Sequence, residues 1–373
     1  MTDTTVAPRT AAGSRVEHPT FEQRVAAGKA ARARSARSSL ADFRPAPDRP
    51  DPISLLEEQA VSRVSELVPI RYGRMSVSPF TFFRGAALIM ASDLAAAPRS
   101  GLSVQTCGDA HMLNFGVFAS PERNLVFDLN DFDETLPGPW EWDVKRLAAS
   151  IEIGGRDRGF TDRERKQAVL AAAEQYRLTL ADLAGQPNLT VWYAKVDAEQ
   201  ALASAGVRAK LRKRSEATLA KARTRDSLQA FEKLTRIVDG EPRIISDPPL
   251  IVPIEELLPE MQSEQLYGVL TGMLRAYRRT LQSDRRHLLE QFRLVQVARK
   301  VVGVGSVGTR AWIVLLLGRD GADPLFLQAK EAQPSVLARF VGKSQYANEG
   351  QRVVAGQRIM QASSDIFLGW ERA

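Results

Sequence analysis

Residues 106–118 (TCGDAHMLNFGVF) and 125–143 (LVFDLNDFDETLPGPWEWD) form the most informative part of the chain. In both, a short apolar run that favours a β-strand leads into a polar loop. The first loop places Asp109 five positions before Asn114. The second segment carries six acidic side chains within 16 positions, at Asp128, Asp131, Asp133, Glu134, Glu141 and Asp143. Aromatic residues are interleaved with these acids, which is unusual for a solvated surface loop.

This mixture of side chains suits a site for magnesium and phosphate. Closely packed carboxylates repel one another unless a cation lies among them. Mg²⁺ prefers hard oxygen ligands, keeps several waters, and needs only one or two carboxylates besides phosphate oxygens. An aspartate can take or orient the proton of an acceptor hydroxyl, and an asparagine oxygen can bind a metal without adding charge. The alternative is a structural hydrogen-bonded network without a metal.

The order G-D-x-H-x-x-N, then D-F-D-E, then G-P-W-x-x-D resembles the aminoglycoside phosphotransferase and choline kinase branch of the protein-kinase-like fold. The resemblance implies that Asp109 is the catalytic aspartate and Asn114 the metal-binding asparagine. It also implies that Asp131 binds the metal and that Asp133 is an auxiliary acid. The implied cofactors are Mg²⁺ and ATP, and the implied substrate is a small-molecule hydroxyl.

Further positions of the same motif follow from this resemblance. His111 matches the loop histidine, a hydrogen-bonding support beside the catalytic aspartate. Asp143, in WDVKRLA, matches the structural aspartate that braces the catalytic loop. Cys107 stands where the branch usually has histidine. Because the spacing from Asp109 to the DFDE segment is slightly longer than usual, Asp128 is an additional candidate metal ligand.

A second group of candidate residues lies near the other end of the chain. Gly303, Gly305 and Gly308 form G-x-G-x-x-G between two strand-like runs, KVVGVG and TRAWIVLLLG. Glycines there allow backbone N–H groups to approach phosphates. A strand follows the glycines, which favours a kinase hairpin over a dinucleotide-binding turn. Lys330, in LQAKEA, resembles the kinase lysine that binds phosphates, and Glu349 lies where its glutamate partner is expected. The alternative is a glycine-rich turn beside a solvated lysine.

The two groups occur in the reverse of the usual kinase order, which indicates a circular permutation. We therefore expect an α+β, protein-kinase-like two-lobe fold with the helical catalytic lobe first and an antiparallel β lobe second. The chain stops at DIFLGWERA, so we expect a truncated small lobe with an incomplete nucleotide pocket. The expected parts are a disordered basic tail (1–50), the helical catalytic lobe (51–237), a hairpin with a connecting helix (238–289), and a Gly-rich β lobe (290–373).

A more specific resemblance covers the chain from about residue 50 to its end. The block FFRGAALIMASDLAAAPRSG, together with CGDAHMLNFGVFASPERNLVFDLNDFDETLPGPWEWDVKRLAAS, is similar to an uncharacterised bacterial family, the domain of unknown function 2252. This resemblance implies common ancestry and no particular activity.

Composition limits the remaining possibilities. Apolar residues make up 44% and charged residues 25% of the 373 residues, and no run is long enough to span a bilayer, so we expect a cytoplasmic protein. The single cysteine and three scattered histidines offer no zinc cluster. The net charge of +7 suits anionic partners. A nucleic-acid-binding protein, suggested by the basic tail and the charged run at 208–225, is a less favoured reading, and the oligomeric state stays open.

Two readings of the function are favoured over nucleic-acid binding. The favoured one is an ATP-dependent and Mg²⁺-dependent phosphotransferase, and the main alternative is a nucleotide-binding pseudokinase or scaffold. Nucleotidyl transfer to a protein is also compatible with the motifs. Three arginines near the catalytic half, Arg71, Arg74 and Arg84, either contact phosphate or form ordinary ion pairs, and we expect ion pairs.

Periodicity and turn signals predict the elements between these motifs. Helices are expected over 53–70, 78–96, 141–155, 162–184, 197–237, 260–282 and 346–362. A hairpin closed by Asp239 and Gly240 is expected within 238–253. Three consecutive antiparallel strands are expected from about residue 291 to Lys330.

Overall fold

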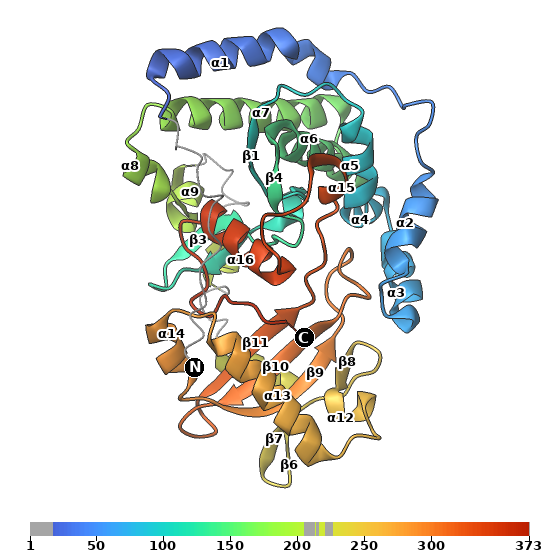
Figure 1. Cartoon of the computed structure of the whole chain (residues 1–373), viewed down its shortest axis with the longest axis vertical. Coiled ribbons are helices and arrows are strands. Elements are labelled where there is room, and N and C mark those ends of the chain that lie inside the picture. Colours follow the sequence, from blue (N-terminus) through green and yellow to red (C-terminus); the bar gives the residue numbers. More distant parts are fainter. Residues whose placement is uncertain (1–17, 205–212, 214–215, 221–226, 373) are drawn as a thin grey trace.

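The computed structural model describes residues 18–204, 213, 216–220 and 227–372. Its fold is α+β, with four antiparallel sheets among these residues. The helices of the upper part in Figure 1 are α1 (Phe21–Arg34), α2 (Pro52–Ala60), α3 (Val68–Met75), α4 (Pro79–Arg84), α5 (Ala87–Ala95), α6 (Trp140–Asp157), α7 (Asp162–Leu183), α8 (Asn188–Trp192) and α9 (Ala198–Ser204). Its strands are β1 (Ser103–Thr106), β2 (Phe115–Ala119), β3 (Leu125–Leu129), β4 (Leu136–Pro139) and β5 (Val196–Asp197).

The lower part in Figure 1 is built around a four-stranded sheet in the order β11-β10-β9-β8. Its strands, with the hairpin below them, are β6 (Thr235–Val238), β7 (Glu241–Ile244), β8 (Ile251–Pro253), β9 (Arg293–Lys300), β10 (Ala311–Leu317) and β11 (Pro324–Lys330). The helices of this part are α11 (Ser227–Leu234), α12 (Ile254–Leu257), α13 (Ser263–Arg278) and α14 (Ser283–Leu289). The last two helices, α15 (Ala338–Val341) and α16 (Glu349–Met360), lie with the upper part.

Apolar side chains cover both faces of the four-stranded sheet. On one face Leu266 of α13 packs with Val297 of β9. On the other face Phe231 of α11 packs with Ile313 and Leu315 of β10. Burial of these β-branched and leucine side chains supplies the main stabilisation of this part. The three expected antiparallel strands are present as β9, β10 and β11, and β8 adds a fourth strand that was not expected.

Two of the expected helices are broken in the structure. The segment expected as one helix over 53–70 forms α2 and α3, because Pro69 occupies the first turn of a new helix. The segment 78–96 forms α4 and α5, interrupted at Gly85 and Ala86. A Cβ on Gly85 would lie 2.7 Å from the Met75 sulfur, so a larger residue there would require the Met75 side chain to move.

The hairpin forms around the predicted turn, since Asp239 and Gly240 both have positive φ between β6 and β7. The single helix expected over 197–237 is replaced by α9 and α11 at its ends, with Thr235–Val238 in a strand. Most of the intervening charged run, 208–225, lies outside the described residues.

The chain returns from the sheet to the upper part through α15 and α16 (Figure 1). Leu337, just before α15, packs with Leu136 and Trp142. A Cβ on Gly356 of α16 would lie 2.4 Å from Thr135, which shows how closely this helix approaches the second polar loop. The late segment therefore fixes the sheet and the early loops relative to each other.

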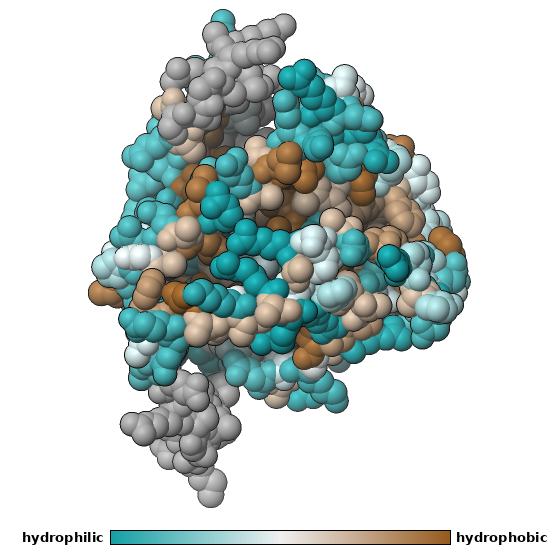
Figure 2. All heavy atoms as spheres, turned by 90° about the horizontal axis from the view of Figure 1, so that it is seen from above, coloured by the Kyte–Doolittle hydropathy of each residue, from teal (hydrophilic) through white to brown (hydrophobic). Residues whose placement is uncertain are grey.

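The first part of the expected tail, residues 1–17, lies outside the described residues. Residues 18–50 include α1, whose Arg34 donates to the Ser100 carbonyl at 2.8 Å, and Arg49 pairs with Asp93. Figure 2 views the molecule from the α1 and α7 end and shows hydrophilic and hydrophobic residues interspersed on that face. No described helix is both long and apolar enough to cross a membrane.

Candidate functional site

The loop after β1 is fixed by Asp143 at the start of α6. The Asp143 carboxylate accepts the backbone N–H groups of Cys107 at 2.7 Å and Gly108 at 3.0 Å. Gly108 has φ of +81°, and a Cβ there would lie 2.3 Å from the Glu134 carbonyl oxygen. Burial raises the pKa of Asp143 to about 6. The contact is the one expected of a residue that braces this loop.

Asp109 lies in the same loop and is held from two directions. The Nε of Arg146, a side chain only 3% exposed, donates to Asp109 Oδ1 at 2.5 Å. The side-chain nitrogen of Asn114 donates to the Asp109 backbone carbonyl at 2.7 Å, which leaves the Asn114 amide oxygen for another partner. His111 is 4% exposed and its Nδ1 has no partner within the described residues. Burial lowers the pKa of His111, against an opposing effect of Asp109.

Asp131 and Asp133 meet Lys330, which arrives from the end of β11. The Lys330 ammonium lies 3.5 Å from Asp131 Oδ1 and 3.2 Å from Asp133 Oδ2, although about 200 positions separate the residues in sequence. Burial acts to lower the pKa of Lys330, but the two carboxylates outweigh it and raise that pKa. Burial and the Asp131 charge raise the pKa of Asp133 to about 6. The early acidic loop and the late lysine are therefore side by side.

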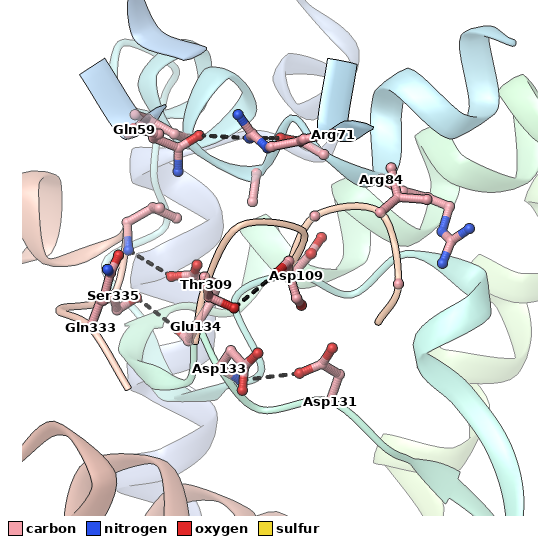
Figure 3. A pocket seen from close by; sticks show the side chains of 18 of the residues that line it. Gln59, Arg71, Arg84, Asp109, Asp131, Asp133, Glu134, Thr309, Gln333 and Ser335 are labelled. Atoms are coloured by element: carbon pink, nitrogen blue, oxygen red, sulfur yellow. Dashed lines mark hydrogen bonds between the residues drawn. The ribbon is translucent and has the colours of Figure 1, made fainter. Parts of the chain in front are cut away.

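A cavity of about 300 Å³ lies beside these groups, and the described lining includes the two aspartates but not Lys330. The candidate residues that border it are Asp109, His111, Asn114, Asp131, Asp133, Gly303 and Gly305. Figure 3 shows Asp109 between two sets of side chains, with Gln59 and Arg71 on one side and Asp131 and Asp133 on the other. The cavity thus has an acidic side and a side that contains arginine.

The glycine-rich loop between β9 and β10 lies against the early helices. Arg74 donates to the Gly303 carbonyl at 2.7 Å, and Arg63 donates to the Val307 carbonyl at 2.6 Å. A Cβ on Gly305 would lie 3.1 Å from the Arg84 carbonyl oxygen, so this close approach favours glycine. Contacts from the early half therefore hold the loop at the rim of the cavity.

Three candidate residues are placed differently from the expectation. Glu349 bonds to Arg352 within α16, while Lys330 is paired with Asp131 and Asp133 instead. Gly308 packs against the Arg63 side chain and is absent from the cavity lining within the described residues. Asp128 points its Oδ1 to the backbone N–H of Leu129 and likewise does not border the cavity described here. Burial raises the pKa of Asp128.

Comparison with known proteins gives a family and no activity. A family model described as an uncharacterized protein conserved in bacteria (DUF2252) matches residues 63–373. The chain belongs to the DUF2252 family. No curated protein and no solved structure matches it. The match includes the early acidic loops of this DUF2252 protein, its glycine-rich loop and Lys330.

Sequence reasoning named three arginines of this DUF2252 protein but expected them in ion pairs, and it missed Arg63 and Arg352. Arg71 and Arg84 border the cavity, and within the described residues neither forms an ion pair, contrary to the expectation. Arg74 also lacks an ion pair in that part of the chain and bonds to a backbone carbonyl instead. Arg352 is 2% exposed and donates to the backbone carbonyls of residues 133, 135 and 333. Buried arginines give no periodic signal in a sequence, and only their three-dimensional partners reveal their roles.

Glu134 was noticed as one acid among six, but the structure gives it a distinct environment. Its Oε2 accepts the Val336 N–H at 2.7 Å. Burial, with added repulsion from Asp109 and Asp133, raises the pKa of Glu134 from 4.5 to about 7. The folded DUF2252 protein therefore holds this proton more tightly than the unfolded chain does.

This raised pKa predicts a pH-dependent stability. As pH rises from about 4.5 to about 7, the unfolded state releases the Glu134 proton first, so the folded state loses stability and then levels off. We expect Glu134→Gln to raise the free energy of unfolding at pH 8 by about 1–2 kcal/mol and to flatten this slope. Urea unfolding of both proteins in EDTA, from pH 4.5 to 8, measures the free energy of unfolding and its slope with pH. Glu58→Gln, at an exposed ion pair, is the control, and an unchanged slope in Glu134→Gln contradicts the prediction.

The oxygen atoms that the structure describes on the acidic side of the cavity are too few to hold a metal ion alone, and they fit one only if a bound ligand supplies further oxygens. Among the described residues, no group of three or more His, Cys, Asp or Glu is arranged to hold a metal ion. Asn114 and Asp131 offer two oxygen donors on the cavity wall. Mg²⁺ is commonly held by one or two carboxylates together with substrate phosphates. The residues therefore suit a cation that enters with a phosphorylated ligand.

Proposed function

We propose that this DUF2252 protein is an ATP-dependent and Mg²⁺-dependent phosphotransferase that acts on a hydroxyl of a small-molecule acceptor. The observation that carries the proposal is the pairing of Lys330 with Asp131 and Asp133, which border the same cavity as Asp109. In this proposal the two parts of the molecule correspond to the lobes of a protein-kinase-like fold in swapped order.

The candidate residues have separate roles in the proposed transfer. Lys330 and the backbone of Gly303 and Gly305 bind the phosphates of ATP. Asn114 and Asp131 would hold Mg²⁺, which neutralises the charge of the phosphates. Asp109 accepts the proton of the acceptor hydroxyl while the new O–P bond forms and the bond from the γ-phosphorus to the bridging oxygen breaks, so that ADP leaves. Because Arg146 occupies Oδ1 of Asp109, the other oxygen, Oδ2, is assigned to the hydroxyl.

A second function, nucleotide binding without transfer, is favoured by one feature. Both key charged groups already have partners, since Asp109 pairs with Arg146 and Lys330 pairs with two carboxylates. A ligand can displace these partners only if its own interactions with Asp109 or Lys330 are stronger than the existing ion pairs. A scaffold that binds nucleotide would tolerate this arrangement, whereas a transferase needs Lys330 to move from the carboxylates to phosphate.

The test is the stabilisation of the purified protein by Mg²⁺ and ATP. At 100 times its dissociation constant, a ligand of the folded state adds about 2.7 kcal/mol to the free energy of unfolding. We expect this gain in wild type with Mg²⁺, and we expect EDTA or Asp131→Asn to abolish it. Release of ADP by wild type identifies the transferase, and stabilisation without release identifies the scaffold.

Asp128→Asn is the matched control, because it makes the same chemical change three positions away and outside the described cavity lining. We expect its response to Mg²⁺ and ATP to equal that of wild type. Wild-type protein that shows no response to Mg²⁺ and ATP would overturn the proposed function. A response lost in Asp128→Asn and kept in Asp131→Asn would reassign the metal ligand.

A further inference from the structure

The side of the cavity away from Asp131 carries an unusual concentration of arginine. Arg63, Arg71 and Arg84 all border the cavity, and we call these three the arginine wall. Within the described residues, none of them is paired with a carboxylate, and each has a buried Nε without a hydrogen-bond partner. The proposed transfer assigns no role to these side chains.

Arg71 is the most deeply placed of the three. It is 1% exposed, and both its Nε and its Nη1 are buried without partners. Only Nη2 has acceptors, the Gly85 carbonyl at 3.2 Å and Gln59 Oε1 at 3.4 Å. A buried guanidinium that lacks a counter-charge costs several kcal/mol, and arginine keeps its proton under physiological conditions.

The neighbouring arginines add to this unbalanced charge. Burial and then the charge of Arg71 lower the pKa of Arg63 to about 10, although Glu134 and Glu331 act in the opposite direction, so the two cations are close enough to repel each other. Burial also lowers the pKa of Arg84, which Asp109 partly offsets. An anion placed among the three would relieve both the repulsion and the missing hydrogen bonds, because guanidinium groups bind oxyanions with charge-assisted bonds.

The position of the wall indicates which substrate brings the anion. Figure 3 places Arg71 on the opposite side of Asp109 from Asp131 and Asp133. The proposed function puts the metal and the transferred phosphate beside these two carboxylates. An acceptor whose hydroxyl reaches Asp109 from the other direction would extend toward the arginine wall.

We infer that the acceptor carries an oxyanion, a phosphate or a carboxylate, and that the arginine wall binds it. This inference rests on the proposed function for the identity of the acceptor. The wall itself is an anion site whose existence can be measured without any nucleotide. The expected acceptors are thus acidic small molecules that bear a free hydroxyl.

The probe is inorganic phosphate, titrated calorimetrically at constant ionic strength maintained with chloride. We expect wild type to bind phosphate in EDTA, and also when it is already saturated with Mg²⁺ and a non-hydrolysable ATP analogue. Arg71→Met should weaken phosphate binding at least tenfold. The same substitution should leave the free energy of unfolding unchanged or raised, because an uncompensated buried charge is replaced by an apolar side chain.

Arg84→Gln is a second variant, which retains a polar side chain and should also weaken phosphate binding at least tenfold. Arg99→Met is the matched control, since Arg99 donates to the Ala95 carbonyl at 2.9 Å and does not border the described cavity. Its phosphate affinity should stay within about twofold of wild type.

Each result decides the inference. Phosphate that competes with the nucleotide analogue would overturn it, because the arginines would then serve the phosphates of ATP. Absence of phosphate binding in wild type, or equal affinity in Arg71→Met, would overturn it as well. If the analogue itself fails to bind, the proposed function fails, while the titration in EDTA still shows whether the arginine wall is an anion site.

Discussion

Asp109→Asn is expected to lower ATP turnover by about 10³-fold while the stabilisation by Mg²⁺ and ATP is retained. The substitution removes the carboxylate oxygen assigned to the acceptor proton and puts an amide in its place, which donates instead of accepting. General-base catalysis by a positioned side chain contributes about 10²–10⁴-fold. The remaining amide oxygen can still accept from Arg146 Nε, so the loop keeps its main contact. ADP release with water as the acceptor measures the effect.

A matched control separates this chemical effect from the loss of an ion pair. Asp93 pairs with Arg49 through two hydrogen bonds, and neither residue borders the cavity as described. Asp93→Asn makes the same change away from the site, and we expect turnover within about twofold of wild type. Asp109→Asn turnover within tenfold of wild type would remove Asp109 from the proposed mechanism.

Arg352→Met is expected to lower the free energy of unfolding by about 3–5 kcal/mol. The 2% exposed guanidinium bonds to the Thr135 carbonyl at 2.7 Å, the Asp133 carbonyl at 2.9 Å and the Gln333 carbonyl at 2.8 Å. It also pairs with Glu349, whose carboxylate would be left without its partner. Removal of one member of a buried charged network leaves unsatisfied groups, which accounts for the size of the effect.

Urea unfolding of the two proteins measures this difference. Arg339→Met is the control, because Arg339 forms an exposed ion pair with Glu58 at 3.1 Å. Exposed pairs contribute about 0–1 kcal/mol, so the control should lose no more than that. A loss below about 1 kcal/mol in Arg352→Met would show that the contacts of α16 contribute little to stability.

The regular elements of the fold were predictable where the sequence carries strong local signals. The alternating and β-branched runs from residue 291 mark β9 to β11, and the Asp239-Gly240 pair marks the hairpin turn. Gly85, a residue type with low helix propensity, stands at the break between α4 and α5, and this signal was overlooked. The proline that starts α3 was a readable signal and was overlooked.

In the candidate site, too, the sequence predicted some features and not others. Motif spacing selected Asp109, Asn114, Asp131 and Lys330, all of which meet in or beside one cavity. It misplaced the partner of the lysine, since Glu349 bonds along its own helix to Arg352. The partner of a charged side chain depends on which backbone segments it reaches, and such long-range geometry leaves no trace in local spacing. Arg63 of the arginine wall was missed for the same reason, whereas Arg71 and Arg84 were named but wrongly expected to form ion pairs.

The ion pair that joins the lysine to the two early aspartates also has a consequence for synthesis of the protein. A ribosome makes the acidic loops first, and nearly 200 further residues must follow before their cation exists. Until α16 has emerged, the nascent chain holds a set of mutually repelling carboxylates with an unfilled contact surface around Thr135. The contacts that complete the cavity can therefore form only late in synthesis. Chaperones would encounter the early half before Lys330 and α16 have packed against it.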